Sequence, residues 1–278
     1  MSVTITPITP NVGVVISGMS GEQLVDPAVA EACLTALQQH GVVLYREVGI
    51  SDADLVAFSK LLGDVVPNPT GEHELPEIAT ITLDPTKTDA ILASYRQGNF
   101  LWHIDGMTDE LPQRATLLTA REIDPAGGDT EFATTYAAYE ALSPEKKAEI
   151  EDLRVVHSFA AAQRRSNPDA SPEEQERWNR MPSRVHPLVW KRRDGRRSLL
   201  LGATADTVVD MPEEQGRALL QELLDWSTQP QFVLRQQWHR DDLVIWDNTG
   251  MLHRALPFEP TSRRLMHRTT LVGVEPIS

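Results

Sequence analysis

The amino-acid sequence predicts a β-rich domain of the α+β class. Many short runs of β-branched and aromatic residues are bounded by glycine, proline, asparagine or aspartate, which is typical of strands joined by turns. Only a few stretches have the apolar spacing of amphipathic helices. The chain has 278 residues and shows no internal repeat. Because this length suits one large domain with a substantial core, we expect residues 1–278 to form a single domain.

The first sixty residues alternate strands with helices. A β-branched run predicts a strand within residues 12–18. Apolar residues at helical spacing predict a helix over residues 27–40, and residues 42–45 form the next strand. Ser51 has the position of an N-terminal cap for a second helix that runs to about residue 62.

The middle of the chain predicts a loop, a strand, a turn, two short helices and a further strand. The loop covers residues 85–100, the strand residues 115–120 and the turn residues 124–130. The two helices cover residues 136–142 and 143 onward, and the further strand covers residues 155–157. Residues 160–183 are polar and interrupt two strand-like runs. Such an insertion could be a lid over a pocket, and a solvated excursion fits the same composition equally well.

A hairpin, a helix and three strands are predicted for the C-terminal part. Residues 185–190 and 198–201 flank Asp194-Gly195, a dipeptide favoured in tight turns between strands. Apolar spacing then predicts a helix over residues 211–226. The three closing strands are residues 231–238, 242–246 and 263–272.

Composition excludes several classes of partner. The net charge of −14 repels nucleic acid and anionic membranes, and the basic residues around Asp194 fit a solvated hairpin tip. The single cysteine, Cys33, excludes an internal disulfide and a cysteine-based zinc ribbon. No apolar run approaches the length of a membrane span, and no secretion signal is recognisable at the start. We therefore expect a cytoplasmic protein with no membrane and no nucleic-acid partner.

The string His103-Ile104-Asp105 can supply half of a metal site. In an extended segment the imidazole of His103 and the carboxylate of Asp105 point to the same side. Two histidines and one carboxylate are the ligands of non-haem Fe(II) oxygenases, and they leave coordination positions free for substrates. His253 follows a strand-like run and a turn, so its side chain can be aimed at the same ion.

Two arginines are expected on one face of the last strand. Period-two alternation places Arg264, Met266 and Arg268 on one side and Leu265, His267 and Thr269 on the other. Two guanidinium groups on a buried face are costly unless anions meet them. That face is therefore either solvated or a binding site for carboxylate-like groups.

Several motifs together resemble the taurine dioxygenase family, which includes the 2,4-dichlorophenoxyacetate dioxygenases. The similarity runs in order over nearly the whole chain. Its motifs are Trp102-His103-Ile104-Asp105, Gly127-Gly128-Asp129-Thr130, Ala137-Ala138-Tyr139-Glu140-Ala141-Leu142-Ser143, His186-Pro187, Trp246-Asp247-Asn248, His253 and Arg263-Arg264-Leu265-Met266-His267-Arg268.

This resemblance implies a double-stranded β-helix (jelly-roll) core with flanking helices. It also implies Fe(II), 2-oxoglutarate and O2 as cofactor and cosubstrates, a small-molecule substrate that is most simply hydroxylated at a C–H bond with release of succinate and CO2, and a homo-oligomer. By position, His103, Asp105 and His253 resemble the metal ligands. Thr130 and Arg264 resemble the residues that bind 2-oxoglutarate, and Arg268 resembles the arginine that faces the anionic group of the substrate.

The predicted substrate-binding residues depart from the taurine enzymes. Asn68 stands in the segment where those enzymes have a histidine, and Thr108 stands where they have an aromatic ring, whereas Asn99 agrees with them. Losing a cation and a ring weakens recognition of a small aminosulfonate. We therefore expect a small, anionic organic substrate and regard a taurine or alkylsulfonate dioxygenase as the alternative.

Two other classes of protein fit part of the pattern. A non-catalytic jelly-roll binding protein would not need the intact ligand set and both arginines. A zinc hydrolase could use the same three ligands, but it would leave Thr130 and Arg264 unexplained.

Overall fold

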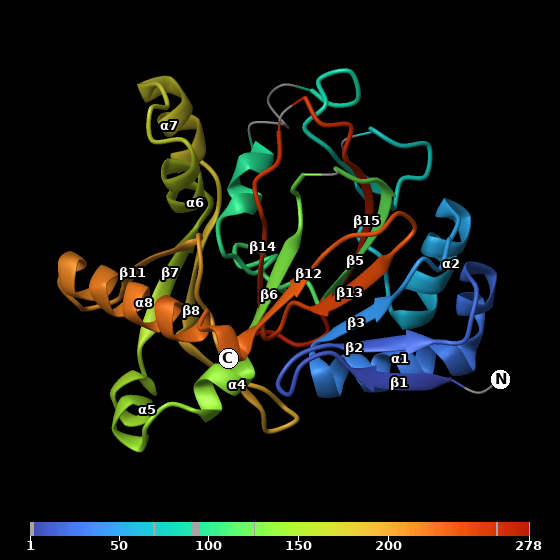
Figure 1. Ribbon diagram of the computed structural model, residues 1–278. Coiled ribbons are helices and arrows are strands. Elements are labelled where there is room, and N and C mark those ends of the chain that lie inside the picture. Colours follow the sequence, from blue (N-terminus) through green and yellow to red (C-terminus); the bar gives the residue numbers. More distant parts are fainter. Residues whose placement is uncertain (1–2, 69–70, 90–94, 125, 260, 278) are drawn as a thin grey trace.

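Two β-sheets face each other and enclose the middle of the molecule. The computed structural model describes all residues except 1–2, 69–70, 90–94, 125, 260 and 278 (Figure 1). The larger sheet has the order β1-β2-β3-β13-β5-β15-β4 and consists of Thr4–Pro7, Val14–Ser17, Val42–Tyr45, Leu243–Asp247, Ala115–Glu122, Leu265–Leu271 and Ala79–Ile81. The smaller sheet has the order β12-β6-β14 and consists of Val233–Gln236, Thr130–Thr134 and Met251–Ala255. This pair of sheets is the expected jelly-roll core.

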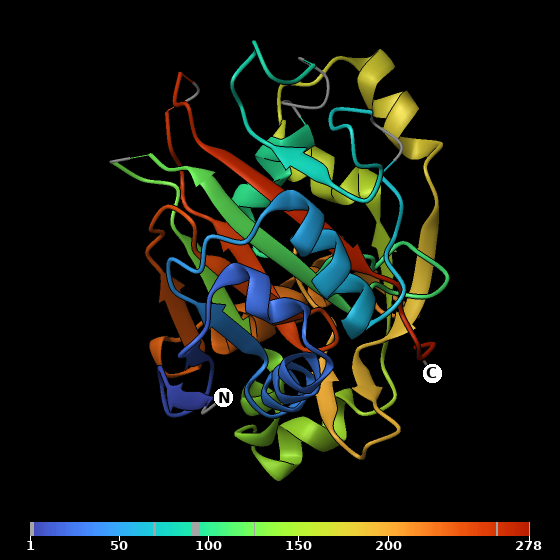
Figure 2. The same ribbon diagram turned by 90° about the vertical axis from the view of Figure 1, so that its right-hand side faces the viewer.

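The larger sheet is covered on its outer face by two helices. α1 (Pro27–His40) and α2 (Asp52–Leu62) pack on alternate residues of the strands, including Val43, Leu117 and Ile245. Figure 2 shows these helices lying over one face of the sheet. The opposite residues of the same strands, such as Leu118 and Trp246, face Phe132 of the smaller sheet. Side-chain alternation thus separates a helix-covered core from a core between the sheets.

The remaining elements form a second cluster beside the smaller sheet. β11-β7-β8 (Ala205–Val208, Arg154–Ser158, Ser183–Pro187) and the hairpin β9-β10 (Val189–Lys191, Arg197–Leu199) pack with α4 (Thr135–Glu140), α5 (Pro144–Ile150) and α8 (Glu213–Ser227). Short 3-10 helices lie at Gly21–Val25, Gln97–Phe100 and Pro230–Phe232. No helix in the described ranges is long and apolar enough to cross a membrane.

Most predicted helices occur where local chemistry fixes their ends. α1 spans the predicted residues, and it ends at Gly41, whose φ of 71° suits a residue without a side chain. Ser51 caps α2 by accepting the backbone N–H of Asp54 at 3.1 Å.

Four sequence-based expectations are wrong. Thr130 was expected to end a turn, but Thr130–Thr134 is a strand. This strand is too short and too buried to show an alternation of apolar and polar residues. His253 follows the strand β13 and a turn, as expected, but it lies inside a further strand, β14, that was not predicted. Residues 183–187 pair with β7, so only 189–199 form the hairpin. The closing strands therefore number four, because β14 joins the three expected ones.

Residues 160–183 are mainly helical. They contain most of α6 (Phe159–Ser166) and all of α7 (Pro172–Asn179). Ser158 and Ser171 cap these helices, which is a local signal that the polar composition obscured. α6 contacts the 3-10 helix Gln97–Phe100, so the insertion lies next to the segment that carries His103.

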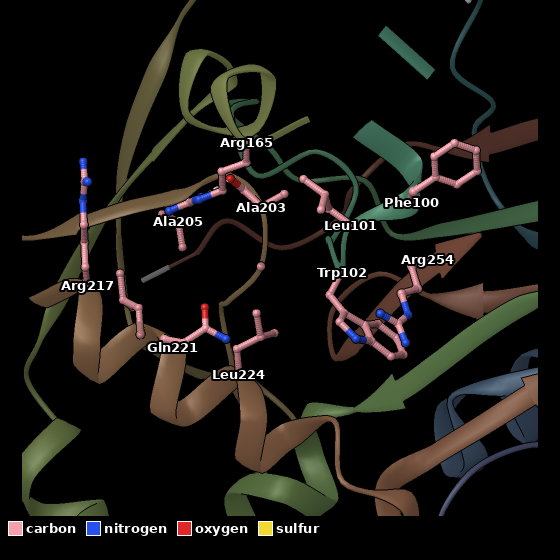
Figure 3. A pocket seen from close by; sticks show the side chains of 12 residues that line it. Phe100, Leu101, Trp102, Arg165, Ala203, Ala205, Arg217, Gln221, Leu224 and Arg254 are labelled. Carbon is pink, nitrogen blue, oxygen red and sulfur yellow. Dashed lines mark hydrogen bonds between the residues drawn. The ribbon is translucent and has the colours of Figure 1, made fainter. Parts of the chain in front are cut away.

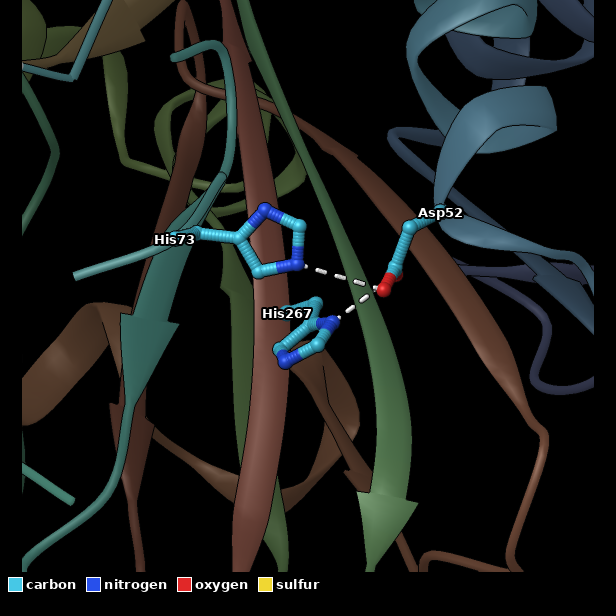
Figure 4. A group of neighbouring side chains, drawn as sticks. All are labelled: Asp52, His73 and His267. Carbon is cyan, nitrogen blue, oxygen red and sulfur yellow. Dashed lines mark hydrogen bonds and ion pairs between the residues drawn. The ribbon is translucent and has the colours of Figure 1, made fainter. Parts of the chain in front are cut away.

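A carboxylate at the start of α2 ties this helix to the sheet. Asp52 accepts from Nδ1 of His267 at 2.8 Å, from Nε2 of His73 at 3.3 Å and from Arg121 at 2.5 Å (Figure 4). Burial opposes ionisation of Asp52, but its interactions with His267 and Arg121 outweigh burial and hold the pKa of this carboxyl well below its ordinary value. The outer face of β15 is thereby joined to α2.

We predict that Asp52→Asn lowers the free energy of unfolding by about 1–3 kcal/mol at pH 7, because it removes charged hydrogen bonds. Since the pKa is depressed in the folded state, this stabilisation is present above about pH 4 and is lost as the pH falls further. Urea unfolding of both proteins from pH 7 to pH 3 measures the difference. Asp64→Asn, which alters an exposed carboxylate just after α2, is the control. A loss that is the same at pH 7 and pH 3 would contradict the prediction.

Candidate metal centre

His103 and His253 are joined through their backbones. The N–H of His103 donates to the carbonyl of His253 at 3.0 Å, and the reverse bond measures 2.9 Å. This antiparallel bridge connects the 101–106 segment to β14. The two imidazole rings consequently lie side by side, with centroids 4.1 Å apart.

Asp105 brings a carboxylate to the same point. Its oxygens lie 3.8 Å from Nε2 of His103 and 3.7 Å from Nε2 of His253. The donor atoms of all three side chains lie within 4.8 Å of one another. The structure thus brings together the three residues that the sequence predicts as metal ligands.

Hydrogen bonding prepares the His103 ring for a metal. Its Nδ1 lies 2.8 Å from the carbonyl of Leu101, and because a carbonyl only accepts, Nδ1 must carry the proton. The lone pair on Nε2 is then free. A backbone carbonyl on the far nitrogen is the usual support of a metal-binding histidine.

The protonation states at neutral pH also suit a metal. Burial opposes ionisation of Asp105, but interactions with His253, Arg268 and His103 lower its pKa to about 2. Burial, reinforced by His103 and partly offset by Asp105, lowers the pKa of His253 to about 3. The site therefore offers one carboxylate and a neutral imidazole, the charge states that a divalent ion requires.

A hydrogen-bond chain supports Asp105 from behind. The hydroxyl of Thr116 donates to Asp105 at 3.1 Å, and the side-chain amide of Asn248 donates to Thr116 at 2.9 Å. Both Thr116 and Asn248 are fully buried. Neither residue was among the predicted site residues. The available sequence signals were the asparagine in Trp246-Asp247-Asn248 and the alternation of the 115–120 strand.

A small cavity adjoins the three ligands and contains most of the other predicted site residues. Its lining residues are Ile81, Asn99, His103, Leu118, Thr130, Trp246, His253, Ala255, Arg264 and Arg268. Arg264, which directly precedes β15, and Arg268 within β15 both line this cavity, as alternation predicts, while His267 points to the opposite face. The indole N–H of Trp238 donates to the hydroxyl of Thr130 at 3.0 Å.

Arg264 is a buried cation without an acidic partner in contact. It is only 4% exposed, and among the described residues no carboxylate forms a salt bridge with it. Its guanidinium lies over the ring of Phe258, 4.9 Å from the centroid. Burial lowers the pKa of Arg264 to about 10, so the group remains charged at pH 7. Of the two alternatives for this face, the anion-binding one fits such a group.

Asn68 and Thr108 are not among the residues that line this cavity. The side-chain amide of Asn68 donates to the carbonyl of Ile78 at 3.1 Å. Thr108 lies in the turn after Asp105 and is partly buried. The structure thus gathers seven of the nine predicted site residues, namely the three ligands with Thr130, Arg264, Asn99 and Arg268.

The cluster of Asp52, His73 and His267 has a similar composition but not the chemistry of a metal site (Figure 4). Nδ1 of His73 accepts the backbone N–H of Leu75 at 3.0 Å, so the proton of the neutral ring is on Nε2, the atom that faces Asp52. Arg121 already forms a salt bridge with the carboxylate of Asp52. His73 and His103 thus have opposite tautomers, and only His103 offers a lone pair to its cluster.

Comparisons with known proteins agree with this site. Residues 4–270 match the model of the "Taurine catabolism dioxygenase TauD, TfdA family". The chain is 32% identical to an alpha-ketoglutarate-dependent 2,4-dichlorophenoxyacetate dioxygenase of Burkholderia sp. (strain RASC), over 93% of this chain and 90% of the relative. It is 29% identical to an alpha-ketoglutarate-dependent sulfate ester dioxygenase of Pseudomonas putida, over 100% and 92%.

Solved structures give the same result. The crystal structure of AAD-2 with Mn(II) and N-oxalylglycine has a TM-score of 0.84 and 29% identity, and each chain is covered completely. A taurine dioxygenase from Burkholderia xenovorans has a TM-score of 0.81 and 27% identity, with 100% and 92% covered. The predicted jelly roll, the enzyme class of 2-oxoglutarate-dependent dioxygenases and their use of Fe(II), 2-oxoglutarate and O2 are confirmed. The chain belongs to the taurine catabolism dioxygenase TauD, TfdA family.

Proposed function

We propose that His103, Asp105 and His253 hold Fe(II) and that the enzyme hydroxylates a C–H bond of a small organic anion. The observation that carries this proposal is the convergence of the three donor atoms beside the buried Arg264, which forms no salt bridge within the described ranges. The iron, when bound with 2-oxoglutarate, supplies the activation of O2, and succinate and CO2 are released. The protein supplies orientation, charge and shelter from water.

Thr130 and Arg264 are proposed to bind 2-oxoglutarate. The guanidinium of Arg264 can pair with the distal carboxylate in a bidentate manner, which would offset its own burial. Thr130 accepts the N–H of Trp238, so its hydroxyl proton remains free to donate to a carboxylate. Both residues would thus contribute to binding the same dicarboxylate.

Arg268 and Asn99 are proposed to meet the substrate. Arg268 lines the cavity 3.9 Å from Asp105, and its buried Nε has no partner among the described residues. An anionic group would satisfy that atom. The same role is proposed for Asn68 and Thr108, which lie outside the cavity lining.

A carboxylic acid is the proposed substrate class. Relatives are named for 2,4-dichlorophenoxyacetate and for (S)-phenoxypropionate, the latter from Sphingobium herbicidovorans at 26% identity over 97% of this chain and 94% of the relative. Both compounds carry a carboxylate on an apolar body. Taurine remains the alternative; the argument against it from Asn68 and Thr108 is weaker because neither lines the cavity.

We further propose a single domain in which α6 and α7 form a lid. The support is the contact of α6 with the 3-10 helix Gln97–Phe100, whose neighbour along the chain is the ligand segment. A cytoplasmic location is proposed from the single, buried Cys33, which suits a reducing compartment. A homo-oligomer is proposed from the resemblance to the family alone.

The proposed metal centre predicts a visible spectrum. Anaerobic addition of Fe(II) and 2-oxoglutarate should produce the weak charge-transfer band of the chelate in the wild type, and succinate should form when O2 and a substrate from a panel of carboxylates are added. His103→Ala should lose both signals. His73→Ala is the matched control and should keep them, because its ring belongs to the other cluster. A band that survives in His103→Ala would refute the ligand assignment.

Arg264→Met should raise the KM for 2-oxoglutarate by about 30-fold or more, since losing one partner of a buried charge pair costs about 2–5 kcal/mol. Succinate formation measured against 2-oxoglutarate concentration tests this. Arg263→Met removes the neighbouring guanidinium, which is exposed and pairs with Glu122, and should leave the KM unchanged. Equal effects of the two substitutions would count against the assignment.

Thr116→Val should weaken metal binding about 10- to 100-fold, because it removes the hydrogen bond that orients Asp105. Thr116→Ser keeps the hydroxyl and should bind as the wild type does. Titration of the apoprotein with Mn2+, followed by the electron paramagnetic resonance of free Mn2+, measures the affinity without turnover. Unaltered affinity in a folded Thr116→Val protein would exclude this positioning role.

A further inference from the structure

A second cavity lies behind the proposed metal centre. Its volume is about 270 Å3, and it is lined by 12 residues (Figure 3). Trp102 directly precedes His103, and Arg254 directly follows His253. Because side chains alternate along extended segments, these two neighbours point away from the metal side and into the second cavity. The carbonyl that orients His103 belongs to Leu101, which also lines this cavity.

Three arginines from three elements surround this cavity: Arg165 of α6, Arg217 of α8 and Arg254 of β14 (Figure 3). Arg165 donates to the carbonyls of Ala203 and Ala205. Arg254 lies over the indole of Trp102, 4.6 Å from the ring centre. The polar groups that converge here are therefore largely hydrogen-bond donors.

No acidic residue is among the lining residues in the described part of the chain. Arg254 pairs with Glu131 and Arg217 with Glu213, but both carboxylates lie outside the lining. Arg165 pairs with no carboxylate within the described ranges. Of the three lining arginines, Arg165 is therefore the one whose charge no contacting carboxylate neutralises within the described ranges, in a chain with a net charge of −14.

Apart from the neutral polar side chain of Gln221, the rest of the lining is apolar. Phe100, Trp102, Leu220 and Leu224 form the walls between the arginines. A cavity of this volume, close to the lower end of the range for ligand sites, fits a compact molecule with one ring or a short alkyl chain. Its apolar body would lie on the walls, and its charge would reach Arg165 at the edge.

We propose that this cavity is an accessory binding site for a small amphipathic organic anion, such as an aryl carboxylate, separate from the proposed catalytic cavity. The chemistry is that of the proposed substrate class, but the site does not depend on it. Neither iron nor 2-oxoglutarate is needed for occupation. Because the ligand would touch Trp102 and Arg254, it would lie against both strands of the histidine bridge.

The test is a 19F nuclear magnetic resonance titration of metal-free protein with 4-fluorobenzoate. We expect saturable binding that persists in Arg268→Met, which removes the charge proposed to attract anions to the catalytic cavity. Arg165→Met should weaken this binding at least 10-fold. Arg164→Met is the matched control: Arg164 lies on the same helix but pairs with Asp206 outside the lining, so the affinity should not change.

A second variant keeps the test independent of the Arg165 contacts with the backbone. Leu220→Phe narrows the cavity without altering charge, and it should also abolish binding of 4-fluorobenzoate. The neutral analogue 4-fluorobenzyl alcohol should bind the wild type more weakly than the acid does. Absence of binding, or binding that disappears in Arg268→Met and survives in Leu220→Phe, would overturn the accessory site. Succinate formation would be unaffected by that result, so the proposed function is tested separately.

Discussion

Two backbone hydrogen bonds between His103 and His253 determine where everything else in the site can lie. They tie a segment with little regular structure to a strand of the smaller sheet. Once this pair is formed, the imidazoles must be neighbours, and Asp105, two residues further, must turn toward them. The side chains contribute the chemistry, while main-chain atoms that are indifferent to residue type set its geometry.

The larger sheet completes the site from the other side. Thr116 of β5 positions the carboxylate of Asp105, while Arg268 of β15 and Arg264, directly before this strand, supply the positive charge. These strands are buried on both faces, so their register is strongly specified. Charged groups can therefore be placed between the sheets at fixed separations, which would be impossible on flexible loops.

Sequence patterns identified most of the residues that the structure brings together at this site, because several of them carried a short-range signal. His103 and Asp105 alternate within one extended segment, and Arg264 and Arg268 alternate within another. Thr130–Thr134 and β14 were not predicted as strands. Strands that are short and buried on both faces lack the alternating polar residues that reveal a period of two. Thr116 and Asn248 escaped for a different reason: a buried hydroxyl or amide gains meaning only from a partner that is distant in the chain. The helices within 160–183 had visible serine caps, but their weak apolar pattern concealed them.

The strand β15 serves two parts of the molecule at once. Arg264 and Arg268 face the space between the sheets, and His267 between them faces Asp52 and α2. An insertion or deletion of one residue here would exchange the two sets, exposing the histidine to the cavity and the arginines to the helices. We therefore expect this strand to vary by substitution and not by insertion or deletion. Length variation, and with it the divergence of substrate preference among relatives, is expected in the segments that border the cavity without belonging to either sheet.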